Sequence, residues 1–190
     1  MDKRIIKTKQ GLRSALRELL RDKPLDKISV KEICARSSTS RVTFYTYYGD
    51  KYDLFKDMLD TIKKETEELF INKQKNNNPE NDFDKSLQNF IDTLYYLEED
   101  FSKEPSFEIN KFEVSYIYKD FILKCIERFE NVYPERMKTR YPVKAVNSFL
   151  AYGLWGFLHW HSGPVTKEEM DYLSMLIKDL IDSNIFSETK

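Results

Sequence analysis

A stretch rich in hydrogen-bonding side chains lies between residues 40 and 47 of this 190-residue chain. Its possible donors are Ser40, Arg41, Thr43, Tyr45, Thr46 and Tyr47. On a short helix, such hydroxyl and guanidinium groups can read base edges in the major groove of DNA. Val42 and Phe44 lack a side-chain donor, so at least one of them must face a core. Lys51 follows at the start of the next helix, where free N–H groups already favour a phosphate.

Catalytic and metal chemistry are not indicated. Cys34 and Cys125 lie far apart in sequence, so two reduced core thiols are expected. His159 and His161 would point about 200° apart on a helix and could not share one ion. The carboxylates at residues 98–100 are typical of a solvated helix face. Because the sequence has no phosphate-binding glycine loop, nucleophile elbow or zinc spacing, it predicts no enzyme and neither metal nor cofactor.

The donor-rich segment needs other helices to hold it in place. Apolar residues recur at helical spacing upstream of it, at Leu12, Ala15, Leu16 and Leu19. Pro24 follows and cannot continue that helix. Ser29 and Glu32 form a capping box that starts a second helix. A short polar break separates this helix from the donor-rich one, which Gly49 ends. Two short helices braced by a longer one predict a helix-turn-helix.

The rest of the chain is also expected to be helical. With only five Gly and six Pro, it has too few turn residues for an all-β fold. A long helix should begin after its cap at Asp50, and residues 76–81 are the clearest loop. Further helices are expected near 83–101, 106–131, 142–161 and 167–185, the last with a capping box at Thr166 and Glu169. The predicted fold is all-α, with a helix-turn-helix DNA-binding domain at 1–50 and a larger helical-bundle regulatory and dimerisation domain at 51–190.

Charge divides along the chain although the net charge is −1. Residues 1–52 carry 13 Lys or Arg against 6 Asp or Glu, a net charge of +7. The remaining residues carry 18 against 26, a net charge of −8. This segregation favours an N-terminal domain that faces a polyanion, with chance surface charge as the alternative.

The run from Ile33 to Phe55, ICARSSTSRVTFYTYYGDKYDLF, resembles the signature of the TetR family of regulators. The shared pattern is an alanine, a turn, a serine, threonine-phenylalanine-tyrosine, two more aromatic-type positions, and a lysine before a leucine. Together with the preceding helix, the resemblance covers about the first 55 residues. The turn departs from the family, which usually has alanine-glycine-valine where this chain has Ser37-Ser38-Thr39. Without the glycine a positive φ at Ser38 is costly, which leaves the turn geometry open.

The resemblance implies roles for individual residues. Contacts to phosphates are implied for Ser29, Tyr45, Tyr47 and Lys51. Contacts to base edges are implied for Ser40, Arg41 and Thr43. Arg41 could instead hold a phosphate, and core packing is the alternative for the tyrosines. Tyr48, where the family usually has phenylalanine, is expected to be buried because of its spacing after Phe44.

The C-terminal region has apolar stripes on two successive helices. The residues that we expect at a dimer interface are Val146, Phe149, Leu150, Gly153, Phe157, Leu173, Leu176, Ile177 and Leu180. Gly153 would let another helix approach closely. The resemblance implies that the last two helices pair with their copies in a four-helix bundle. Ordinary core packing within one chain is the alternative.

The middle of the chain, residues 83–133, is rich in aromatic residues. Phenylalanine and tyrosine supply the apolar walls and few polar tips that a ligand pocket needs. The candidate pocket residues are Phe90, Tyr95, Phe112, Tyr116 and Trp155. Because no Lys or Arg cluster lies among these rings, a neutral or cationic small molecule is expected. An aromatic stripe at helical spacing can equally be plain core.

The sequence therefore predicts a homodimeric, DNA-binding transcriptional regulator that recognises a palindromic operator in double-stranded DNA. The form that the sequence favours is a repressor released by a small-molecule effector. One alternative is an activator, or a regulator controlled by a partner protein without a ligand. The other is a helical interaction protein that no longer binds DNA. Because no uncharged apolar run of about 18 residues or signal-peptide segment is found, a cytoplasmic protein without a membrane partner is expected.

Overall fold

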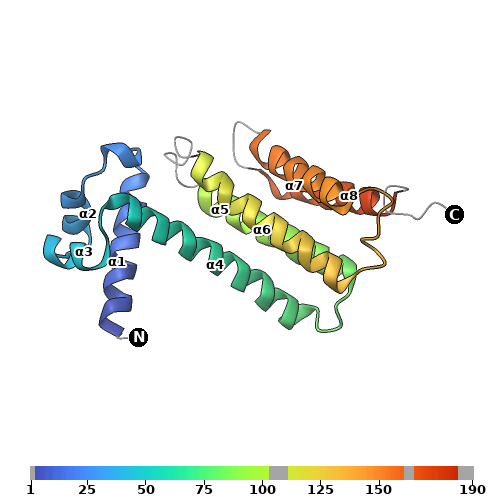
Figure 1. Ribbon diagram of the computed structural model, residues 1–190, viewed down its shortest axis with the longest axis horizontal. Coiled ribbons are helices and arrows are strands. Elements are labelled where there is room, and N and C mark those ends of the chain that lie inside the picture. The colour runs from blue at the N-terminus through green and yellow to red at the C-terminus, as the bar shows by residue number, and fades with distance from the viewer. Residues whose placement is uncertain (1–2, 103–110, 161–164, 184–190) are drawn as a thin grey trace. The chain divides into compact units, whose positions relative to one another are not determined.

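The computed structural model describes residues 3–102, 111–160 and 165–183, and within these ranges its regular structure is entirely helical (Figure 1). The elements follow in the order α1 (Lys3–Leu20), η1 (Leu25–Lys27), α2 (Val30–Arg36), α3 (Arg41–Tyr47), α4 (Lys51–Asn77), α5 (Phe83–Ser102), α6 (Lys111–Val132), α7 (Val143–Trp160) and α8 (Lys167–Ile181). The predicted all-α fold is confirmed. Both expected capping boxes are present, at Ser29 with Glu32 and at Thr166 with Glu169.

The described residues form two compact units. Unit 1 contains residues 3–62 and 111–114, and unit 2 contains residues 63–102, 115–160 and 165–183. Helix α4 contributes residues 51–62 to unit 1 and 63–77 to unit 2. The expected domains at 1–50 and 51–190 stay a prediction, because contacts within one chain do not establish which part folds alone.

Unit 1 has a small apolar core. The apolar stripe expected on α1 is buried, with Leu12 and Leu16 at 0% exposure. Ile33 from α2, Phe44 from α3 and Leu54 from α4 are also 0% exposed. The core thus receives a side chain from each of the four α-helices, and this fixes the short helices α2 and α3, which are too short to be stable alone.

The core of unit 2 contains many of the aromatic residues of the middle region. The Phe90 and Phe121 rings stack with centroids 5.8 Å apart, and Phe83 meets Phe129 edge to face at 5.6 Å. Tyr118 is 2% exposed, and its hydroxyl donates to the Glu98 carboxylate at 2.6 Å. Much of the aromatic stripe is therefore core, in line with the alternative that the sequence left open.

Helix α4 ends later than the sequence suggested. Residues 76–81 were expected to form a loop, but α4 continues to Asn77. The Asn77 and Asn89 side chains exchange hydrogen bonds of 2.9 and 2.8 Å between α4 and α5. Asn78, 2% exposed, donates to Ser86 Oγ at 2.8 Å. Because α5 satisfies these amides, asparagines that usually favour turns here extend a helix and its buried end.

Candidate functional site

Helix α3 has one buried and one exposed side. Phe44 faces the core of unit 1 at 0% exposure, with the Tyr45 and Tyr48 rings 5.3 and 5.7 Å from it between centroids. Val42 and Tyr45 are 80% and 57% exposed. The expectation that Val42 or Phe44 must face the core is confirmed by Phe44. The exposed side of α3 also carries Arg41, and α3 contains no acidic residue.

The hydroxyls at the start of α3 already have local partners. Ser40 caps the helix, because its Oγ accepts from the Thr43 backbone N–H at 3.0 Å. The Ser40 and Thr43 hydroxyls are hydrogen-bonded to each other at 2.8 Å. A hydroxyl group has one donor and two acceptor positions, so this pair can still bond a base edge. The Thr46 hydroxyl donates to the Val42 carbonyl at 2.9 Å.

The turn between α2 and α3 adopts a left-handed conformation at a serine. Ser38 has a φ of 52°. The Thr39 N–H donates to the Cys34 carbonyl at 2.9 Å and the Ser38 N–H to the Ala35 carbonyl at 3.4 Å. This is the Schellman arrangement that ends helices, usually with glycine at the left-handed position. Serine there costs about 1 kcal/mol relative to a right-handed conformation, but the geometry of a tight helix-turn-helix is kept.

One carboxylate ties the end of α3 to two other helices. Asp57 Oδ2 on α4 accepts from the Tyr48 hydroxyl at 2.7 Å and from Arg13 Nη1 on α1 at 2.8 Å. Burial raises the pKa of the Asp57 carboxyl, but the bonds from Tyr48 and Arg13 outweigh burial and hold that pKa below its ordinary value. Tyr48 is 4% exposed, as expected from its spacing after Phe44. The residue that follows α3 is therefore fixed by a charge-assisted network.

The Lys51 ammonium group is held by the backbone of unit 1. Lys51 Nζ donates to the carbonyls of Asp26 at 2.9 Å and Ile28 at 2.8 Å. Ser29, next in the chain, caps α2 through its capping box with Glu32. Hydrogen bonds from Lys23 and Ser29 lower the pKa of Glu32 to about 2. Both Lys51 and Ser29 thus have structural partners in addition to the phosphate contacts that the resemblance implies.

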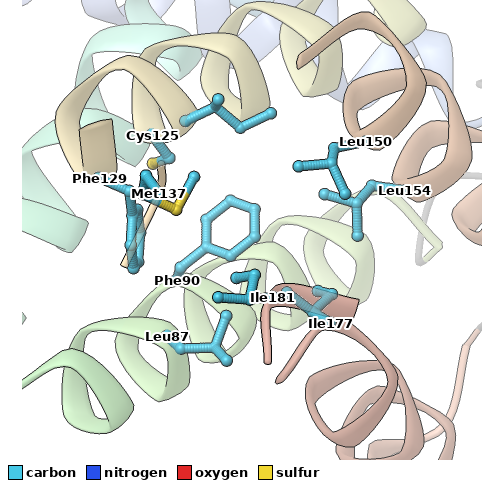
Figure 2. A pocket seen from close by; sticks show the side chains of 10 residues that line it. Leu87, Phe90, Cys125, Phe129, Met137, Leu150, Leu154, Ile177 and Ile181 are labelled. Carbon is cyan, nitrogen blue, oxygen red and sulfur yellow. The ribbon is translucent and has the colours of Figure 1, made fainter. Parts of the chain in front are cut away.

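Unit 2 contains a small apolar cavity of about 30 Å³ (Figure 2). Helices α5, α6, α7 and α8 and the segment after α6 line it, through Leu87, Phe90, Cys125, Ile126, Phe129, Met137, Leu150, Leu154, Ile177 and Ile181. Its wall contains no polar side chain apart from the Cys125 thiol, and burial raises the pKa of that thiol. Such a wall favours an apolar occupant.

The five candidate pocket residues are not gathered around this cavity. Phe90 lines it, whereas Tyr116 is 57% exposed. Tyr95 and Trp155 are half-buried at other positions, and the side chain of Phe112 lies outside the described part. The ligand pocket stays a prediction, with the lining residues above as its structural candidate. They come from four helices and the segment after α6 with no common spacing, so a local aromatic pattern could indicate only Phe90 and Phe129.

The candidate interface residues divide into two groups. Val146, Leu150, Leu173 and Ile177 are buried within the chain. Phe149 and Leu176 are 68% and 53% exposed, Gly153 is exposed, and Phe157 and Leu180 are half-buried. The exposed apolar surface also includes Tyr152, Tyr172 and Met175, which the sequence analysis did not select. We call Phe149, Tyr152, Tyr172, Met175 and Leu176 the exposed α7–α8 residues.

The described residues hold neither a metal-ligand cluster nor a membrane-spanning helix. No group of three or more His, Cys, Asp or Glu in this part of the chain could hold a metal ion. None of the helices that the structure describes is both long and apolar enough to cross a membrane. His159 and His161 give no further information, because the His159 side chain and all of His161 lie outside the described part.

Residues 12–58 match the family model of bacterial regulatory proteins of the tetR family. An uncharacterized HTH-type transcriptional regulator of Bacillus subtilis (strain 168), YxbF, is 34% identical over 53 residues. That segment covers 28% of this chain and only 14% of YxbF. The residues that match the family model include the helix-turn-helix of α2 and α3.

Two solved structures are similar over nearly the whole chain. A transcriptional regulator (TerR/AcrR family) from Aquifex aeolicus VF5 has a TM-score of 0.56 at 20% identity, covering 92% of this chain and 98% of its own. A TetR-family transcriptional regulator from Pectobacterium atrosepticum has a TM-score of 0.58 at 14% identity, covering 100% of both chains. At these identities the likeness concerns the fold.

Proposed function

We propose that this chain is a transcriptional regulator of the tetR family, whose family model matches residues 12–58, and that it acts as a homodimeric repressor which a small-molecule effector releases from a palindromic operator. The observation that carries DNA binding is the exposed side of α3, which presents Arg41 and Tyr45 without any carboxylate. An α-helix with its side chains is about 10–12 Å wide and fits the major groove, which is about 12 Å wide. Residues 1–52 add a net charge of +7.

The proposed contacts combine phosphate and base recognition. Arg41 and Thr43 approach base edges, while Tyr45 and Tyr47 contact phosphates on either side. Lys51 keeps one N–H for a phosphate, because an ammonium group has three donors and two are used on the carbonyls of Asp26 and Ile28.

The DNA-binding proposal predicts a steep dependence of affinity on salt. If each subunit neutralises four or five phosphates, log K against log salt concentration should have a slope of about −7 to −9 for the dimer, from about 0.9 per phosphate. An operator duplex is first selected from a random pool of DNA sequences. Fluorescence anisotropy with this duplex at several salt concentrations then measures the slope. A slope near zero with an intact circular dichroism spectrum would rule out the proposal.

Two charge-removing variants sharpen that measurement. Arg41→Ala should lose about 1–3 kcal/mol of discrimination between operator and unrelated DNA if Arg41 reads a base. If Arg41 holds a phosphate, the same variant flattens the slope and leaves discrimination unchanged. The matched control is Lys85→Ala, which removes one positive charge from an exposed position on α5 in unit 2; its slope should equal that of the wild type.

Dimerisation is supported by the exposed α7–α8 residues, because a single chain leaves these apolar side chains in contact with water. Phe149, Met175 and Leu176 are each more than half exposed. A Cβ at Gly153 would meet no atom of its own chain within 4 Å. The glycine is therefore not required by packing within the chain, and it permits a helix of a second copy to approach closely.

Release by an effector is supported by the apolar cavity between the helices of unit 2, which at about 30 Å³ must widen to admit an aromatic ring. A ligand there must bind the released form better than the DNA-bound form, and a tenfold shift in operator affinity needs about 1.4 kcal/mol of that difference. A thermal-shift screen of neutral aromatic and aliphatic compounds should yield ligands that weaken the protein–operator complex on titration. Leu154→Phe narrows the cavity, so these ligands should no longer raise the melting temperature of the variant. Ligands that stabilise the wild type and Leu154→Phe equally, or that leave operator affinity unchanged, would contradict the proposal.

A further inference from the structure

We propose that Val42 is a specificity-determining residue that recognises the C5-methyl group of thymine in the major groove. The inference rests on the proposed DNA binding. Val42 is 80% exposed, more than any other large hydrophobic side chain in the described residues. It lies on the helix whose outward side chains otherwise carry hydrogen-bonding groups. Sequence reasoning passed over it because it cannot donate a hydrogen bond.

The position of Val42 on α3 follows from that of Phe44. Residues two apart on a helix point about 200° apart, and Phe44 is 0% exposed in the core. Val42 therefore lies on the side away from the core. Tyr45 and Thr46, three and four residues later, share that side and are also exposed. Val42 thus lies within the surface that the proposed function directs into the major groove.

Two hydroxyl groups close to Val42 on α3 already have hydrogen-bond partners within the protein. The Thr46 hydroxyl, one turn later, donates to the Val42 carbonyl at 2.9 Å. Its proton is therefore directed at the backbone and not at a base. The Thr43 hydroxyl is bonded to Ser40 at 2.8 Å. A base edge next to Val42 meets methyl groups, and thymine is the base that offers a methyl group in the major groove.

The fold itself gains nothing from valine at this position. A branched side chain is a weaker helix former than alanine. At 80% exposure Val42 also buries little apolar surface within the chain. Contact between Val42 and a thymine methyl group would remove both from water, and burying one methyl group corresponds to about 0.8 kcal/mol, or about fourfold in affinity.

The test replaces thymines of the selected operator, one symmetric pair at a time, with deoxyuridine, which lacks only the C5-methyl group. For the wild type, one pair should weaken binding by about fourfold per half-site. For Val42→Ala, the same replacement should have a much smaller effect, because the γ-methyl groups of Val42 that reach the thymine are gone. Ile6→Ala removes another exposed aliphatic side chain of unit 1, 45% exposed on α1, and should keep the wild-type response.

Other outcomes overturn the inference. If no thymine pair distinguishes the wild type from Val42→Ala, Val42 does not read a methyl group. If Val42→Ala weakens operator and unrelated DNA by the same factor, Val42 contacts the backbone. In both cases the wild type still binds its operator, so the proposed function survives. A wild type that selects no duplex overturns the proposed function together with this inference.

Discussion

Leu176→Glu is expected to convert the proposed dimer to a monomer and to abolish operator binding. Leu176 is 53% exposed in one chain, so the glutamate should not disturb the fold of the monomer. In the proposed dimer it would place an unpaired charge inside an apolar interface, which costs several kcal/mol. Sedimentation at micromolar concentration should show the mass of one chain. Operator affinity should fall to that for unrelated DNA, because a palindrome is read by two helices held about one DNA turn apart.

The matched control is Tyr96→Glu on α5. Tyr96 is 55% exposed, so the control places the same charge at an apolar position of equal exposure outside α7 and α8. It should remain dimeric and bind the operator. If Leu176→Glu also remains dimeric, the exposed α7–α8 residues do not form the interface.

Phe44→Ala should be the most destabilising single change in the recognition segment. Phe44 is 0% exposed and is the buried residue that anchors α3 in the core. Truncation of a buried phenylalanine to alanine costs about 3–5 kcal/mol, a large part of a typical stability of about 5–15 kcal/mol. Without Phe44 the seven-residue α3 keeps only its Ser40 cap and the Tyr48–Asp57 hydrogen bond, which are too little to hold so short a helix, so DNA affinity should fall as well. Urea denaturation followed by circular dichroism measures the loss.

The control for Phe44→Ala lies two residues away on the same helix. Val42→Ala removes an 80% exposed side chain and should change the free energy of unfolding by no more than about 0.5 kcal/mol. Equal losses for the two variants would mean that α3 is not anchored through Phe44.

The helix-turn-helix could be predicted because its signals are local. A capping box needs only residues three apart, and both boxes were found at Ser29 and Thr166. The burial of Phe44 and Tyr48 follows from helical spacing around the exposed donors. A family signature adds order and spacing to these signals, which is why the fold and the recognition helix were anticipated together.

What could not be predicted depends on residues distant in sequence. Arg13 and Asp57 are 44 residues apart, and nothing in either segment shows that Tyr48 completes their network. The two carbonyl partners of Lys51 are 25 and 23 residues upstream. A free phosphate-binding lysine and one bound to backbone oxygens have the same sequence pattern. Positive φ at Ser38 was foreseen as costly, and the turn adopts it because the Schellman hydrogen bonds offset the strain.

Each unit of the chain contains one thiol, and both thiols are buried. Cys34 in unit 1 is 5% exposed and Cys125 in unit 2 is 3% exposed. Burial raises the pKa of both groups, so neither forms the reactive thiolate while its unit is closed. Alkylation of each cysteine is therefore limited by how often its own unit opens. The two labelling rates give separate opening free energies for the DNA-contacting and the cavity-containing parts of one unmodified protein.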